Sequence, residues 1–252
     1  MKIALCAFPI YSSIRQAFAV MQEKIIQAVS LGCALIVFPE ACLSGLDISG
    51  VQEKDTKLSL AIDSRELNTI RELARKLTIH ICFGFLELVD DKVYDSAVLI
   101  DDRGQIVIHY RRISPGWLLP GMSEEFNPCG DVVEYAQTVF GKTAILVCGD
   151  LFYPSITDTV TAQKPDLTFH IMARAYPVTD DIQQRWETQE LPYYTDEWAK
   201  LGGLVLSVNA IETFFIDEHN AYCGGAWVYS ATEGLLASHA LLEDSLFVHE
   251  LP

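Results

Sequence analysis

Two short apolar runs flank an amphipathic segment at the start of the chain, and this order restricts the fold more than any other feature. Lys2–Phe8 and Ala34–Phe38 are predicted strands, and the segment between them is a predicted helix. Ser12 or Ser13 is its expected N-cap, and Gly32 ends it. The apolar face of this helix consists of Ile14, Phe18, Met21, Ile25 and Val29. A β-α-β unit has a right-handed crossover, so the two strands are expected to be parallel.

The next part of the chain changes from alternating elements to successive strands. Ser44–Lys57 is predicted to be a loop, and Asp63–Leu77 is predicted to be a helix capped by Asp63 or Ser64. Three strands then follow one another with only short turns between them, at Ile79–Leu86, Val93–Ile100 and Gln105–Arg111. Strands joined by short turns pair as antiparallel hairpins. The sheet is therefore expected to be mixed.

The second part of the chain repeats this order. Thr143–Val147 and Asp166–Met172 are predicted strands on either side of a helix at Ser155–Gln163. Asp181–Leu201 is predicted to be helical, with an interruption at Pro192–Tyr194. The later predicted strands are Leu204–Asn209, Thr213–Ile216, Gly224–Tyr229, Leu235–His239 and Ser245–Leu251. The repetition favours two similar halves that form one α/β domain over residues 1–252.

Composition restricts the partners and the cellular compartment. The formal net charge is −16, and a field of that sign repels nucleic acid and anionic membranes. Seven cysteines without a C-x-x-C pair indicate reduced thiols and a cytoplasmic location. The six histidines are scattered, so neither a metal nor another cofactor is expected. No apolar run approaches the roughly 18 residues of a spanning helix. The expected partner is a small-molecule substrate.

Cys148 follows a buried strand directly and stands before a sharp turn and a helix. Gly149 and Asp150 come next, and Pro154 precedes the helix. In α/β enzymes this is where a nucleophile is placed, with backbone N–H groups beyond it to face developing negative charge. Asp150 is expected to form the turn or to support the site. The alternative for Cys148 is a core cysteine, since free cysteines are often buried.

Two further charged residues follow predicted strands, Glu40 in V-F-P-E and Arg112 in H-Y-R-R. Strand ends of one sheet converge at a common edge, so these residues are expected to share a pocket with Cys148. A carboxylate takes the proton of a thiol, and a fixed cation with the N–H of Gly149 stabilises an oxyanion. The alternatives are a helix start for Glu40 and a solvated strand end for Arg112.

The irregular segment Ser114–Gly130 is long for a compact domain, which is typical of a functional loop. It contains Trp117 and the pair Glu124 and Glu125. Trp117 and Tyr153 are candidates to line a substrate pocket, and core packing is the alternative for both.

Three segments together resemble the nitrilase superfamily of carbon–nitrogen hydrolases, namely I-V-F-P-E-A-C-L-S-G, H-Y-R-R and L-V-C-G-D-L-F-Y-P. Leu206–Ala210 and Gly224–Ala226 resemble later segments of that family. The resemblance implies a four-layer α-β-β-α sandwich that pairs into a homodimer or a higher homo-oligomer. It also implies a Glu-Lys-Cys triad that hydrolyses amides or nitriles through a thioester. By position, Glu40 is the base and Cys148 the nucleophile.

The sequence departs from the family at the lysine, because Arg112 holds that position. Arginine keeps the charge but is longer, planar and effectively never deprotonated. The family's supporting loop glutamate corresponds to Glu124 or Glu125. The sequence thus predicts a carbon–nitrogen hydrolase of small amides or nitriles; the alternative is a pseudoenzyme of the same fold that binds a ligand or a partner subunit. Arg111 and Arg112 together leave room for a substrate with a carboxylate.

Overall fold

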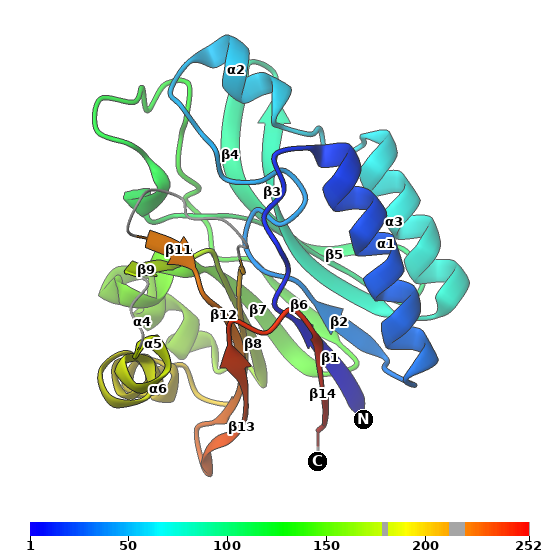
Figure 1. Cartoon of the computed structure of the whole chain (residues 1–252), viewed down its shortest axis with the longest axis vertical. Helices are drawn as coiled ribbons and strands as arrows, with labels where there is room; N and C mark the ends of the chain where they lie inside the picture. Colours follow the sequence, from blue (N-terminus) through cyan, green and yellow to red (C-terminus); the bar gives the residue numbers. More distant parts are fainter. Residues whose placement is uncertain (178–180, 212–219, 252) are drawn as a thin grey trace.

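Two six-stranded sheets lie face to face at the centre of the computed structural model, which describes residues 1–177, 181–211 and 220–251 (Figure 1). The first sheet has the order β14-β1-β2-β3-β4-β5. Its strands are β1 (Lys2–Cys6), β2 (Leu35–Val37), β3 (His80–Val89), β4 (Lys92–Ile100), β5 (Ile106–Arg111) and β14 (Leu246–Glu250). The second sheet has the order β13-β12-β10-β8-β7-β6. Its strands are β6 (Tyr135–Thr138), β7 (Gly141–Val147), β8 (Leu167–Met172), β10 (Leu204–Asn209), β12 (Gly224–Ser230) and β13 (Gly234–Leu241).

Helices cover the outer face of each sheet, which confirms the α-β-β-α sandwich (Figure 1). The helices α1 (Ile14–Ser30) and α3 (Arg65–Leu77) pack on the first sheet. On the second sheet lie α4 (Pro154–Gln163), α5 (Ile182–Arg185) and α6 (Leu191–Leu201). A small two-stranded sheet of β9 (Ala175–Pro177) and β11 (Asn220–Tyr222) lies beside them.

Alternation along the strands separates two hydrophobic layers. In β1, Ile3 and Leu5 belong to the core between the sheets, whereas Ala4 and Cys6 belong to the core under α1 and α3. Successive side chains of a strand point to opposite faces, so one apolar strand serves both layers. This is why the central strands read as nearly continuous apolar runs.

The two sheets have the same topology, which confirms the prediction of two similar halves. In each, three consecutive strands are parallel, β1-β2-β3 and β7-β8-β10. Two antiparallel strands follow, β4-β5 and β12-β13. One further antiparallel strand flanks the first, β14 in one sheet and β6 in the other. Consequently β2 and β8 occupy corresponding places.

Two predictions about local structure were wrong. The segment predicted as a loop over 44–57 ends in a helix, α2 (Gln52–Lys57). The buried carboxylate of Asp55 accepts hydrogen bonds from the backbone of Ser49 and Gly50, and these bonds fix the chain that enters the helix. The helical region after 181 is not interrupted at Pro192. Its irregular turn is a π-helical segment at Trp186–Glu190, and Pro192 stands directly after this segment, at the second residue of α6.

Three short strands, β6, β9 and β11, were not predicted, because each has only three or four residues. The predicted strand at Thr213–Ile216 lies outside the described residues.

The two predicted serine caps differ in the structure, which allows a matched test. Ser64 caps α3, and its side chain accepts a hydrogen bond from the N–H of Leu67, whereas Ser13 stands at the N-cap of α1 without a side-chain bond. We expect Ser64→Ala to lower the free energy of unfolding by about 1 kcal/mol and Ser13→Ala to change it by less than about 0.5 kcal/mol. Urea unfolding of both variants measures the difference. Equal losses would contradict this account of the α3 cap.

Candidate active site

Glu40, Arg112 and Cys148 meet in the space between the two sheets. Glu40 follows β2 and Arg112 follows β5, both in the first sheet, whereas Cys148 follows β7 in the second. The sequence had suggested that the strand ends of one sheet converge here. In the structure, strand ends of both sheets do so. Nη1 of Arg112 donates to Oε1 of Glu40 at 2.7 Å, and the thiol of Cys148 lies within hydrogen-bonding reach of the same carboxylate.

Arg112 is held by partners on every side. Besides Glu40, its Nε donates to the hydroxyl of Ser114 at 2.9 Å, and its Nη1 lies 3.3 Å from Oδ2 of Asp95. The remaining nitrogen, Nη2, lies against two glycines. A Cβ atom at Gly149 would come within 2.7 Å of Nη2, and one at Gly116 within 3.1 Å. The backbone around the guanidinium thus leaves room for a planar, branched cation.

The charge of Arg112 is stabilised although the side chain is buried. Burial is the largest influence and opposes that charge, but the negative charges around it, of which Glu40 has the largest effect, together raise the pKa of the guanidinium above its ordinary value. Burial, and then the charge of Glu40, raises the pKa of Asp95 well above the usual range. Asp95 therefore favours its neutral form.

The thiol of Cys148 is protonated in the resting protein. Only 9% of the residue is exposed. Burial, and then the charge of Glu40, raises the pKa of the thiol to about 12, although Arg112 and Arg174 lower it in part. A nucleophilic attack by this sulfur consequently requires a base that takes the proton as the bond forms. Glu40 is in the position to do so.

The turn at Cys148 is fixed by a buried aspartate. Cys148 has a φ of +46°, a left-handed value that is rare for a residue with a side chain, and a short 3₁₀ helix follows over Cys148–Phe152. Asp150 accepts hydrogen bonds from the N–H groups of Val147 and Ser114 and from the hydroxyl of Tyr110. It therefore both forms the turn and ties it to the segment that carries Arg112.

His170 is a second support of this turn, and no motif in the sequence indicates a role for it. The ring is fully buried in β8, and burial lowers its pKa to about 4, so it is neutral. Nδ1 accepts a hydrogen bond from the indole of Trp198 at 3.2 Å. The proton must then be on Nε2, which donates to the carbonyl of Cys148 at 3.1 Å. The only sequence signal was a single histidine in an apolar strand.

The residues predicted from the long loop and from the start of α4 lie in different surroundings. Trp117 is buried and packs in a small cluster that includes Leu86 and Val93. Its indole nitrogen, both amide atoms of the fully buried Asn127 and Oδ1 of Asp95 have no hydrogen-bond partner among the described residues. Glu124, Glu125 and Tyr153 are exposed. That Glu124 and Tyr153 bind the substrate stays a prediction. The same holds for a role of Glu124 or Glu125 in supporting the triad.

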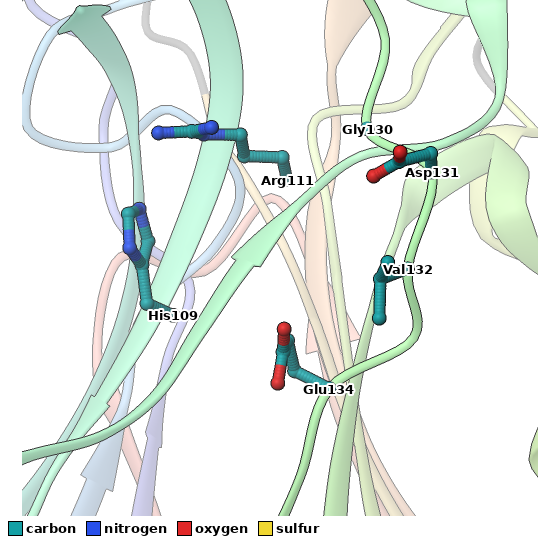
Figure 2. A pocket seen from close by; sticks show the side chains of 6 residues that line it. All are labelled: His109, Arg111, Gly130, Asp131, Val132 and Glu134. Atoms are coloured by element: carbon teal, nitrogen blue, oxygen red, sulfur yellow. The ribbon is translucent and has the colours of Figure 1, made fainter.

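Arg111 points away from this site, because neighbouring residues alternate in direction along β5. Its guanidinium donates to the buried carboxylate of Glu87 at 2.8 and 3.2 Å and lies 4.3 Å from the ring centre of Tyr94. Figure 2 shows Arg111 and His109 on one side of a separate surface cavity of about 200 Å³, with Asp131 and Glu134 on the other. Arg111 is thus no part of a pocket at Cys148.

The described residues contain no group of three or more His, Cys, Asp and Glu side chains arranged to hold a metal ion. Within the same part of the chain, none of the helices has the length and apolar character needed to cross a membrane.

The ion pairs of Glu87 predict a specific loss of stability in acid. Burial raises the pKa of Glu87, but hydrogen bonds from His109 and Arg111 outweigh this and lower it from 4.5 to about 2. The ionised group therefore stabilises the folded protein at neutral pH, and this contribution is lost as the pH falls from about 4.5 toward 2. Between pH 6 and pH 3 we expect the native protein to lose about 2 kcal/mol more than Glu87→Gln. Urea unfolding at both pH values measures this.

Glu134→Gln is the matched control, since Glu134 is exposed on the opposite side of the same cavity. It should follow the native protein. If Glu87→Gln lost as much stability as the native protein between the two pH values, the pairing of Glu87 would not explain the acid sensitivity.

Comparison with known proteins identifies the family. The family model of carbon-nitrogen hydrolases matches residues 2–195. A cyanide hydratase of Microdochium sorghi is 26% identical over 220 residues, which make up 81% of this chain and 56% of that protein. A formamidase of Pseudomonas syringae pv. tomato is 28% identical over 182 residues, 69% of this chain and 50% of that protein. The chain spans about half the length of these relatives.

The fold agrees with this result. The crystal structure of a carbon-nitrogen hydrolase from Helicobacter pylori G27 superposes with a TM-score of 0.83 over 98% of this chain and 88% of that one, at 16% identity. Since the family's sequence pattern extends over residues 2–195 of the 252, the protein belongs to the carbon-nitrogen hydrolase family, as its resemblance to the nitrilase superfamily had predicted.

Proposed function

We propose that the protein hydrolyses a small amide, or a nitrile, through a thioester on Cys148, with Glu40 as the base and Arg112 as the cation that stabilises the oxyanion. The observation that carries the proposal is the 2.7 Å contact between Arg112 and Glu40, with the protonated thiol in reach of the same carboxylate. Nucleophile, base and cation are thus assembled in one buried place.

For an amide, the first half of the reaction forms the thioester. The sulfur of Cys148 bonds to the carbonyl carbon while the thiol proton moves to Glu40. The negative charge on the oxygen is stabilised by Nη2 of Arg112 and by the N–H of Gly149. The C–N bond then breaks, and Glu40 returns the proton to the leaving nitrogen, so that ammonia departs.

The second half reverses these roles. Water attacks the thioester carbon and gives a proton to Glu40, the C–S bond breaks, and the sulfur of Cys148 takes the proton back. The products are a carboxylic acid and the original thiol. Arg112 remains charged throughout, since a guanidinium does not exchange protons near neutral pH. Its part is electrostatic, which an arginine performs as well as a lysine if the surrounding atoms fit it.

The surroundings of Arg112 support activity over the pseudoenzyme alternative. Ser114 accepts from Nε, a position that a lysine lacks, and Gly116 and Gly149 give room for Nη2. The site is built around the arginine, which argues against a lysine position that has simply decayed.

Ammonia release from small amides and nitriles tests the nucleophile. We expect Cys148→Ala to abolish it, with a loss of at least about 1,000-fold, because no other group forms the thioester. Cys33→Ala is the matched control, since Cys33 is a buried cysteine under the helices of the first sheet. It should retain native activity. Release that is undiminished in Cys148→Ala, or absent from the native protein with every amide and nitrile, would overturn the proposal.

Arg112→Lys tests whether the arginine is suited to its place. A lysine lacks the second and third nitrogens, so it cannot reach Glu40, Ser114 and the space at Gly149 together. We expect kcat to fall by about 100-fold or more. Near-ultraviolet circular dichroism checks that the variant is folded. An activity above that of the native protein would instead identify Arg112 as the defect of a pseudoenzyme.

A further inference from the structure

Arg174 lies at the end of the strand beside the nucleophile. In the register of β7 and β8, Val147 is opposite Ile171, so the turn at Cys148 begins next to the last residues of β8. Arg174 follows this strand by two residues. The N–H of the preceding Ala173 donates to Oε2 of Glu40 at 2.5 Å. The backbone that carries Arg174 is therefore part of the wall of the site.

The position of Arg174 is fixed from two directions. Its N–H donates to Oδ1 of Asn209 at 2.8 Å, and Nδ2 of Asn209 donates back to its carbonyl at 3.1 Å. Its guanidinium lies 5.8 Å from the ring centre of Tyr176, and the hydroxyl of that tyrosine donates to the buried Tyr194 at 3.2 Å. A cation held on an aromatic ring by a clamped backbone loses little freedom when it binds an anion.

Arg174 differs from Arg112 in its ion pairs within the described residues. Arg112 is paired with Glu40, whereas no Asp or Glu within the described ranges forms an ion pair with Arg174. The side chain of Arg174 is exposed, and it is close enough to lower the pKa of the Cys148 thiol in opposition to burial. In a chain with a net charge of −16, Arg174 thus adds a positive charge near Cys148.

We propose, as an extension of the function proposed above, that Arg174 binds a carboxylate of the substrate. The preferred substrates are then amides that carry a carboxylate at their other end. A guanidinium binds a carboxylate through two parallel hydrogen bonds, which orients the substrate as well as attracting it. The sequence had suggested Arg111 and Arg112 as the residues near a substrate carboxylate. Arg111 points away from the site and Arg112 is already paired with Glu40, so we assign this role to Arg174.

The monoamide and the diamide of the same dicarboxylic acid form a matched pair of substrates, which differ in charge but hardly in shape. With succinic and glutaric acids as the parents, we expect the native protein to prefer the monoamide. Arg174→Gln should lower kcat/KM for the monoamide by about 10- to 100-fold, mainly through KM, and leave the diamide within about threefold. Arg174→Lys should keep part of the preference. Arg103→Gln, which changes an exposed arginine in a turn, should match the native protein.

Equal losses for the monoamide and the diamide in Arg174→Gln would overturn the proposal, since they would mean that Arg174 acts only on the thiol or on the fold. A native protein that prefers the diamide would overturn it as well.

Alkylation of Cys148 gives a second readout, which needs no turnover. Iodoacetate and iodoacetamide both form a C–S bond with loss of iodide and of the thiol proton, and only iodoacetate carries a carboxylate. The ratio of their rates at Cys148 should be about 10-fold lower in Arg174→Gln than in the native protein. If this ratio changes while no amide or nitrile is hydrolysed, the proposed function fails and the anion site stands. If amides are hydrolysed and the ratio is unchanged, the anion site fails alone.

Discussion

The buried ion pair of Glu40 and Arg112 is the interaction on which the rest of the site depends. Both residues are almost without solvent contact, and removing two charges from water costs several kcal/mol for each. Attraction between the charges offsets this cost only where further hydrogen bonds satisfy the remaining donors and acceptors. The structure supplies them: Ala173 donates to the second oxygen of Glu40, and Ser114 accepts from Nε of Arg112.

These supporting bonds connect the ion pair to the turn at Cys148. Asp150 accepts from the N–H of Ser114 and also from that of Val147, so one carboxylate holds both the partner of Arg112 and the strand end before Cys148. His170 holds the carbonyl of Cys148 from the other side. Because the strained turn is held from two directions, the thiol of Cys148 is kept close to the carboxylate of Glu40.

The sequence was sufficient for the main elements and for the expectation that Glu40, Arg112 and Cys148 lie together, because each of the three stands shortly after a predicted strand. The sequence was not sufficient for residues whose role depends on how side chains pack in the folded protein. Asp95 and His170 stand within strands, and a polar residue there does not reveal which partner it meets. The helix α2 depends on bonds to the buried Asp55, which no local pattern indicates. Arg174 gains its position from the register of β7 and β8.

The repeated topology explains how the charges are divided between the halves. Glu40 follows β2 and Arg174 follows β8, and these strands have corresponding places in the two sheets. The first half thus contributes Glu40 and Arg112, which form an ion pair, and the second contributes Cys148 and Arg174, for which no ion pair is found among the described residues. Neither half holds a complete site, so the apolar contacts between the sheets also set the distance from Glu40 to the thiol. In the proposed hydrolysis, a misplacement of about 1 Å would be enough to lower the rate about 100-fold, so the inter-sheet core would serve that reaction as well as the stability of the fold.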